Sequence, residues 1–187
     1  VSDLDGRLSG ALKGRPAALV EWAASAWRKS PTLADQHLAG RTLAELHLAG
    51  QDYTARRDNP VGPSHWRALA ERSATRAEGS DREMLDEIER LMPDLARLFD
   101  PSFLPQGAIH ADYFPDNVLF DGDRIGGVID FYYGCNGALV YDLAIALSAW
   151  GFDAEGRADP EAIKAFHQGY ESVRPLTAME ASLLPQM

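Results

Sequence analysis

Cysteine is almost absent from this sequence. Cys135 is the only cysteine among 187 residues, so no disulfide bond can form within the chain. A chain without disulfides fits a reducing compartment, and we expect a cytoplasmic protein. No histidine is close to Cys135 in the sequence, and we interpret this residue as a small packing side chain and not as a nucleophile.

Long apolar runs and an excess of positive charge are also missing. No run of 18 apolar residues exists, and the most apolar stretch, 138–152, is interrupted by Asp142, so we expect no membrane partner. The 18 Lys and Arg residues face 28 Asp and Glu residues, which gives a net charge of -10. Because nucleic-acid binding needs clustered basic residues, we expect an acidic surface and no nucleic-acid partner.

What is present suits one globular domain with its own core, since 45% of the residues are apolar and 25% are charged. The first residues have the pattern of the end of a β-rich region. Residues 13–16, Lys-Gly-Arg-Pro, are typical of a turn, and 17–22 form a short apolar run of strand length. Residues 23–29 have the composition of a linker.

A helix is predicted to begin near residues 30–32. Thr32 and Asp35 have the spacing of a capping box, which favours a helix start at this point. One face of this helix carries Ala39, Leu43, Leu46 and Gly50. His47 lies beside that face, and we expect a hydrogen-bonded core histidine and not a metal ligand, because no second ligand follows at helical spacing.

The middle of the chain is less regular. Residues 51–79 are polar and broken by Pro60 and Pro63, and we expect a loop with short helical pieces. Residues 81–99 return to helical spacing, with a kink or a restart expected at Pro93. One stripe of this helix, which we expect to lie in the core, carries Met84, Ile88, Leu91, Leu95 and Leu98.

Short strands and then helices are predicted after residue 101. Strands are expected at 108–109, 118–120 and 125–129, with Asp121-Gly122 in a tight hairpin turn between the last two. Helices are expected at 139–150, at 160–173 and from Thr177, where Glu180 completes a second capping box. Because the chain begins with Val1 and ends soon after Thr177, we expect a piece truncated at both ends.

Three side chains around the predicted hairpin form the candidate site. Pairing the strands about the midpoint between Asp123 and Arg124 sets Asn117 opposite Asp130, so an amide oxygen and a carboxylate are expected to meet at the open end. These are hard oxygen donors of the kind that Mg²⁺ prefers. Asp112 precedes Asn117 by five residues, in a loop that can direct it toward the same point.

This set has the groups that phosphoryl transfer needs. One carboxylate, Asp112, would accept the proton of a substrate hydroxyl, and two oxygen ligands would hold the Mg²⁺ that bridges the ATP phosphates. His110 is expected to brace the loop through hydrogen bonds and to take no part in the chemistry. Asp142 has two open interpretations: a carboxylate at a helix start, favoured by the helix dipole, or a group that ties the helix to the loop or touches substrate.

The motifs resemble the aminoglycoside phosphotransferase and choline kinase superfamily. The resemblance is carried by residues 108–120, which read AIHADYFPDNVLF, by 127–136, which read GVIDFYYGCN, and by YDLAIAL at 141–147. Within the superfamily, the wider pattern, including residues 14–20 and 43–47, is most similar to the kinase-like homoserine kinases of bacteria.

The resemblance implies an α+β, protein-kinase-like fold, seen here mostly as its helical C-lobe. Residues 1–24 would be a short β remnant of the N-lobe with its hinge, and 25–187 the C-lobe. The activity implied is ATP- and Mg²⁺-dependent phosphorylation of L-homoserine. Asp112 would be the catalytic base, Asn117 and Asp130 the Mg²⁺ ligands.

The resemblance also implies that the hinge residues Val20, Glu21 and Trp22 meet adenine, although the family's hinge is more apolar. No G-x-G-x-x-G occurs in the sequence, and Lys13, in a turn, is a poor phosphate ligand. We therefore expect that a missing N-lobe is required and that this chain alone is inactive. The alternatives are another small-molecule kinase, acting on an aminoglycoside, choline or a sugar, and an inactive fragment that acts only as a binding module.

Overall fold

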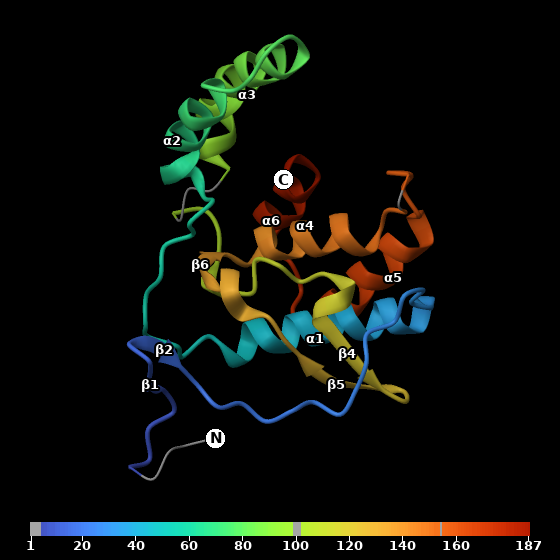
Figure 1. Ribbon diagram of the computed structural model, residues 1–187. Coiled ribbons are helices and arrows are strands. Elements are labelled where there is room, and N and C mark those ends of the chain that lie inside the picture. The colour runs from blue at the N-terminus through green and yellow to red at the C-terminus, as the bar shows by residue number, and fades with distance from the viewer. Residues whose placement is uncertain (1–4, 99–101, 154) are drawn as a thin grey trace.

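The computed structural model describes residues 5–98, 102–153 and 155–187 as a mixture of helices and short strands (Figure 1). The helices are α1 (Leu33–Ala49), α2 (Pro63–Ala74), α3 (Ser80–Arg97), α4 (Leu139–Trp150), α5 (Pro160–Glu171) and α6 (Ala178–Leu183). The strands are β1 (Gly10–Leu12), β2 (Arg15–Ala17), β3 (Gln106–Ile109), β4 (Val118–Asp121), β5 (Arg124–Val128) and β6 (Cys135–Ala138). Three short 3₁₀ turns are η1 (Pro115–Asn117), η2 (Phe131–Tyr133) and η3 (Leu184–Gln186). The strands form three two-stranded antiparallel sheets, β1–β2, β3–β6 and β4–β5.

Helix α1 begins as the sequence predicts. The Thr32 side chain accepts a hydrogen bond from the backbone of Asp35, and the Asp35 carboxylate accepts one from the backbone of Thr32, which completes the capping box. The predicted face is buried at Ala39 and Leu43. The same reciprocal cap is found at Thr177, before α6. The N-terminal ends of α1 and α6 are therefore fixed by residues close to them in the sequence.

The main core lies where α1, α4 and α5 meet the β4–β5 hairpin. Its buried members are Ala39, Leu43, Ala44, Tyr113, Val118, Phe120, Leu143, Ala146, Trp150, Phe166 and Tyr170. Helices α1 and α5 lie side by side in Figure 1, and two glycines allow their close contact. A Cβ atom on Gly40 would lie 2.0 Å from the carbonyl oxygen of Phe166, and one on Gly169 would lie 1.9 Å from that of His37. The backbones therefore touch directly at these points.

Helices α2 and α3 form an arm that stands apart from the rest of the molecule (Figure 1). The prediction of a loop with short helical pieces at 51–79 is met in part: the helical piece is α2, a regular helix of 12 residues whose first turn holds Pro63, a position where proline fits a helix. Helix α3 runs through Pro93 without a restart. Phe99, the last residue of the predicted helix, lies outside the described residues.

The prediction that the apolar stripe of α3 lies in the core was wrong. None of the described residues of α3 is buried, and Met84 and Ile88 are 62% and 40% exposed. The stripe turns toward α2 instead, around a cavity of about 280 Å³ lined by Trp66, Leu69, Ala70, Ser73, Leu85, Ile88, Met92 and Leu95. Periodicity identified the apolar face correctly, but a two-helix arm is too thin to cover it.

The N-terminal segment follows the prediction only in part. The turn at Lys13 and Gly14 is present, and both residues have positive φ between β1 and β2. The predicted strand at 17–22 was wrong, because β2 ends at Ala17 and no strand among the described residues pairs with 18–22. The predicted linker contains one bridge, in which Ala26 pairs with Phe120 of β4.

The register of the β4–β5 hairpin differs from the predicted one. Its two-residue turn is Gly122–Asp123, so the strands pair about the midpoint of these two residues and not about the predicted midpoint between Asp123 and Arg124. A bulge at Leu119/Phe120 leaves one extra residue in β5. The backbone N–H of Ile129 donates to the carbonyl of Asn117 at 3.0 Å. Asn117 is therefore opposite Ile129, and Asp130 follows one residue later.

Among the described residues, no helix has the length and apolarity needed to cross a membrane.

Candidate active site

The loop between β3 and η1 holds Asp112 and Asn117 together. The side-chain amide of Asn117 donates to the backbone carbonyl of Asp112 at 2.8 Å and to its carboxylate at 3.3 Å. The Asp112 carbonyl also accepts from the backbone of Phe114 at 2.8 Å, which closes the turn. Asp112 is only half-buried, so its carboxylate is held in position and can still meet a substrate.

Asn117 and Asp130 present oxygen atoms from the two ends of the hairpin. Asn117 is 8% exposed, and because its nitrogen is used by Asp112, its carbonyl oxygen is the group left for a ligand. Asp130 lies two residues after the end of β5, exposed and in the left-handed region, with φ +63° and ψ +54°. A non-glycine residue seldom adopts this conformation, and such residues cluster at functional sites.

These two oxygen donors fit a Mg²⁺ ion. Mg²⁺ in nucleotide sites is held by one or two protein side chains, with phosphates and water completing its octahedron. Within the described part of the chain, no group of three or more His, Cys, Asp or Glu residues has the arrangement of a metal site. The donor set therefore suits a nucleotide-bound cation and not a closed structural metal.

Asp142 ties helix α4 to the loop that carries Asp112. Its carboxylate is fully buried and accepts three hydrogen bonds: from the backbone N–H groups of His110 and Ala111, each at 2.8 Å, and from the His47 ring at 2.9 Å. Of the two interpretations that the sequence left open, these contacts favour the tie to the loop. Ala111 has a φ of +61°, so the tie holds a strained backbone directly before Asp112.

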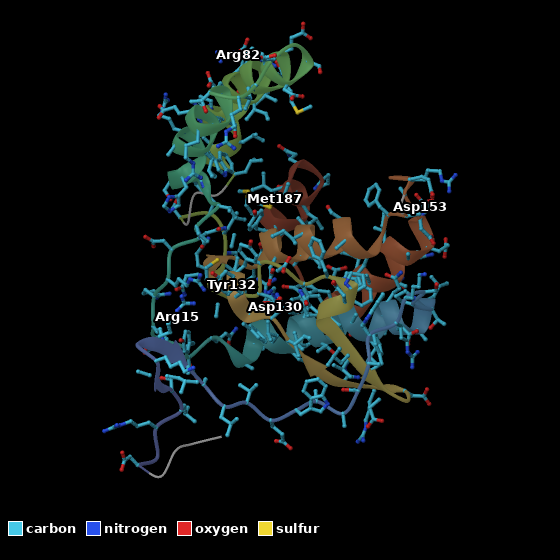
Figure 2. All side chains as sticks on the ribbon, in the orientation of Figure 1. Arg15, Arg82, Asp130, Tyr132, Asp153 and Met187 are labelled. Carbon is cyan, nitrogen blue, oxygen red and sulfur yellow. The ribbon has the colours of Figure 1, made fainter. Side chains whose placement is uncertain are left out.

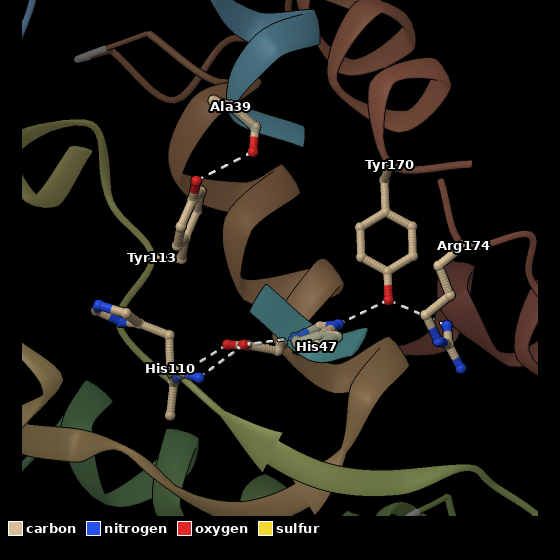
Figure 3. A network of polar contacts seen from close by, with 8 residues as sticks. Ala39, His47, His110, Tyr113, Tyr170 and Arg174 are labelled. Atoms are coloured by element: carbon tan, nitrogen blue, oxygen red, sulfur yellow. Dashed lines mark hydrogen bonds and ion pairs between the residues drawn. The ribbon is translucent and has the colours of Figure 1, made fainter. Parts of the chain in front are cut away.

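The tie continues as a chain of buried polar contacts (Figure 3). The hydroxyl of Tyr170 contacts the second nitrogen of His47 at 2.8 Å and accepts from Arg174 at 3.0 Å. Arg174 in turn donates to the buried Glu180 at 2.7 Å, and Glu180 caps α6. His47 is thus the hydrogen-bonded core histidine that the sequence predicts, and it connects the Asp112 loop with the C-terminal helices.

His110 braces the loop as predicted. Its Nε2–H donates to the carbonyl of Ile129 at 2.9 Å, and its ring lies 4.6 Å from the ring of Phe131, centre to centre. These contacts join the Asp112 loop to the chain on either side of Asp130, which Figure 2 shows at the end of β5. The Nδ1 atom of His110 is buried and has no hydrogen-bond partner within the described residues.

The predicted hinge residues lie on the surface. Val20 and Trp22 are 77% and 88% exposed, Glu21 is also exposed, and the segment has no regular structure. The segment that follows runs along β5, where Gly126 leaves room for Ser25: a Cβ on Gly126 would lie 2.5 Å from its hydroxyl oxygen. No described contact joins 20–22 to Asp112, Asn117 or Asp130.

Sequence reasoning missed strand β6 and its partner segment. The backbones of Arg57 and Asn136 are joined by a hydrogen bond of 2.9 Å, and the Asn136 side chain accepts another from Arg57. The Arg57 guanidinium donates to the carbonyls of Tyr132 and Gly134. Cys135 is buried in this strand, and burial raises the pKa of its thiol to about 11, which agrees with a packing role. The sequence Cys-Asn-Gly-Ala gives no strand signal that could have predicted β6.

Comparisons with known proteins identify the class. Residues 2–176 match the phosphotransferase enzyme family, and the chain belongs to that family. An aminoglycoside phosphotransferase from Alicyclobacillus acidocaldarius has a TM-score of 0.69 and 19% identity, over 98% of this chain and 61% of that one. The amicoumacin kinase hAmiN, solved with AMP-PNP and Ca²⁺, has a TM-score of 0.70 and 16% identity, over 97% and 58%. The fold is thus the α+β, protein-kinase-like fold predicted from the sequence.

One curated relative has a much higher sequence identity to this chain than these solved structures have. The homoserine kinase of Rhizobium johnstonii is 44% identical over 181 residues, which are 97% of this chain and 56% of that protein. The chain therefore spans a little over half the length of the relative it matches.

Proposed function

We propose that the protein transfers the γ-phosphoryl group of ATP to the hydroxyl of L-homoserine. The observation that carries the reaction type is the contact between Asp112 and Asn117 beside Asp130, in a chain of the phosphotransferase enzyme family. The choice of homoserine is supported by the 44% identity to a protein named homoserine kinase. In this proposal residues 1–24 belong to an N-lobe and its hinge, and 25–187 form the C-lobe.

Asp112 acts as the base. Its carboxylate accepts the proton of the substrate hydroxyl as the oxygen forms a bond to the γ-phosphorus, and the bond from that phosphorus to the bridging oxygen breaks, releasing ADP. Asn117 and Asp130 would hold Mg²⁺, which supplies charge neutralisation at the phosphates when bound. The protein contributes position and a fixed electrostatic environment, and the tie from Asp142 serves both.

The test is a comparison of acceptors. The natural protein, at the length at which it is expressed, is supplied with Mg²⁺ and ATP, and ADP release is measured with L-homoserine, choline and kanamycin. The expected result is the highest kcat/KM with L-homoserine. ADP release no higher with L-homoserine than without acceptor would overturn the assignment.

The second candidate is a kinase of the aminoglycoside or choline type. The observation in its favour is the fold shared with an aminoglycoside phosphotransferase and an amicoumacin kinase. The same assay separates it from the first, since kanamycin or choline would then give the faster reaction. A binding module without catalysis would release no ADP with any of the three acceptors.

A further inference from the structure

A solvent-open cavity of about 580 Å³ lies next to the candidate site. It is formed by the C-terminal end of α1, the segment at 53–57, strand β3 and the segment that follows Asp130. Its lining residues are Leu46, Ala49, Gly50, Tyr53, Ala55, Arg56, Arg57, Ala108, Ile109, Phe131, Gly134, Cys135 and Asn136.

The two chain segments that carry Asp112 and Asp130 also contribute residues to the lining of this cavity. Phe131 directly follows Asp130, and Ile109 precedes Asp112 by three residues. The ring of Phe131 packs on His110, whose Nε2–H donates to the carbonyl before Asp130. A molecule in the cavity would therefore lie beside both the proposed base and the proposed metal ligand.

The lining combines an apolar wall with one free cation. Leu46, Ala49 and Ile109 supply aliphatic surface. Of the two arginines, Arg57 is occupied by the carbonyls of Tyr132 and Gly134. Arg56 lines the same cavity, and its guanidinium makes no hydrogen bond or ion pair with any other described residue.

The lining contains no acidic side chain to balance Arg56. A guanidinium presents a planar fork of donors that matches a carboxylate, and a charge-assisted pair of this kind is about twice as strong as a neutral hydrogen bond. Cationic acceptors, such as choline or an aminoglycoside, would meet a like charge at this point, which disfavours them. The chemistry of the cavity therefore selects a small molecule with an anionic group and a short aliphatic chain.

We propose that this cavity binds the acceptor substrate by its carboxylate, with Arg56 as the counter-ion, and so selects an amino acid over a cationic alcohol. The proposal rests on the proposed function and adds to it the residue that determines specificity. The methylene groups of the acceptor lie along the apolar wall, and Arg57 positions the segment that carries Arg56 by holding it to β6.

The test compares Arg56→Ala with Arg56→Lys and with Arg67→Ala in the natural protein. Arg67 is an exposed arginine on α2 that does not line the cavity, so its loss matches the change in charge. Arg56→Ala is expected to raise the KM for L-homoserine about 10- to 100-fold with little change in kcat, since a hydrogen-bonded charge pair is removed equally from bound substrate and transition state. Arg56→Lys restores part of the affinity, and Arg67→Ala leaves KM unchanged.

An acceptor without the carboxylate gives a second readout. The primary amide of L-homoserine lacks the carboxylate and keeps the cationic ammonium, so Arg56→Ala is expected to phosphorylate it with a kcat/KM at least equal to that of wild type. An unchanged KM for L-homoserine in Arg56→Ala, or an equal loss of kcat/KM for acid and amide, would overturn the role of Arg56 while the proposed function stands. A wild-type protein inactive with L-homoserine would remove the proposed function, and this proposal with it.

Discussion

Asp112 is the residue on which the proposed chemistry depends. Asp112→Asn keeps the shape of the side chain and removes its ability to accept a proton. We expect turnover to fall about a hundredfold to ten-thousandfold, the usual contribution of a general base, while ATP binding is retained. The matched variant is Asp130→Ala, which should instead weaken Mg²⁺-ATP binding. Steady-state kinetics and nucleotide titration of both variants would check this, and a near-normal rate in Asp112→Asn would remove the assignment of the base.

Asp142 is the residue that holds the loop. Asp142→Asn replaces one carboxylate oxygen with a nitrogen that cannot accept, so at least one of three buried donors loses its partner. We expect the free energy of unfolding to fall by about 3 kcal/mol and kcat to fall as the loop loses its position. Urea denaturation and kinetics measure the two effects. Asp94→Asn on the surface of α3 is the control, and equal behaviour of the two variants would contradict the role of the tie.

At the residue scale, the sequence predicted part of the site. The five-residue spacing of Asp112 and Asn117 predicted that the two side chains lie close together, and their hydrogen bond confirms it. The position of Asp130 was missed by one residue, because the turn of the hairpin lies one residue earlier than predicted and the bulge in β5 offsets only half of the resulting shift. Arg56 has no sequence signal at all, since only the packing around it separates it from Arg57.

At the scale of the elements, the contribution of the N-terminal end of α1 to the stability of the fold depends on pH through Asp35. Burial alone would raise the pKa of this carboxyl, but its hydrogen bonds with Arg28 and Thr32 outweigh burial and hold the pKa below the ordinary value of 3.8. A lowered folded-state pKa stabilises the fold above that value, and the gain is lost as the pH falls through the folded-state pKa.

The variant Asp35→Asn tests this linkage. We expect it to reduce the free energy of unfolding by about 1–2 kcal/mol at pH 7, since it loses a cap and an ion pair. The difference from wild type should shrink below pH 4. Thermal unfolding from pH 7 to pH 3 measures it, and a difference that stays constant over this range would argue against a role for the charge.

The contact between α1 and α5 depends on having no side chain at two positions. Gly169→Ala would gain about 1 kcal/mol from helix propensity alone. The new Cβ, however, would overlap the backbone of His37, and rigid backbone cannot move aside cheaply. We expect a net loss of about 2–3 kcal/mol in the free energy of unfolding, measured by urea denaturation. Gly10→Ala, which meets no atom within 4 Å, should be close to neutral, and equal values for both would refute the argument.

The elements that the sequence predicted best have signals within a few residues. Helix α4 was predicted with its observed bounds from its apolar run, and both predicted capping boxes are present. Helix α2 was predicted only as short helical pieces within a loop, because Pro63 was interpreted as a breaker and not as a first-turn residue. The strand at 17–22 was wrongly predicted because an apolar run needs a partner strand, which composition does not reveal.

For the whole molecule, we expect that a polypeptide of these 187 residues alone releases no ADP from ATP. The sequence has no G-x-G-x-x-G loop, and Lys13, its lysine nearest the N-terminus, lies in the β1–β2 turn with a φ of +51°. Little therefore holds the β- and γ-phosphates. A coupled ADP assay on this polypeptide, with Asp112→Asn as the blank, measures it, and release that depends on Asp112 would show the expectation to be wrong.

At this scale the sequence predicted the fold through its motifs and not through its periodicity. The segments at 108–120 and 127–136 carry the resemblance to the phosphotransferase family, and the fold found by comparison agrees. Periodicity predicted a single core that would include α3. It could not distinguish a helix that packs on the body from one that packs mainly on its neighbour, because both bury one face.

The α2–α3 arm has a consequence for how this fold can vary. Each of its two helices finds its apolar cover mainly in the other, and the arm leaves the body between α1 and β3. Its length, angle and surface can therefore change without repacking the core, since lengthening a surface connection costs little free energy. The chain entering the arm passes Arg56 and Arg57, so a redesigned arm would reshape the wall of the proposed acceptor cavity while the Asp112 loop stays as it is. Under the proposed function, the part of the molecule that could be retuned for new acceptors is therefore separate from the part that must stay fixed for phosphoryl transfer.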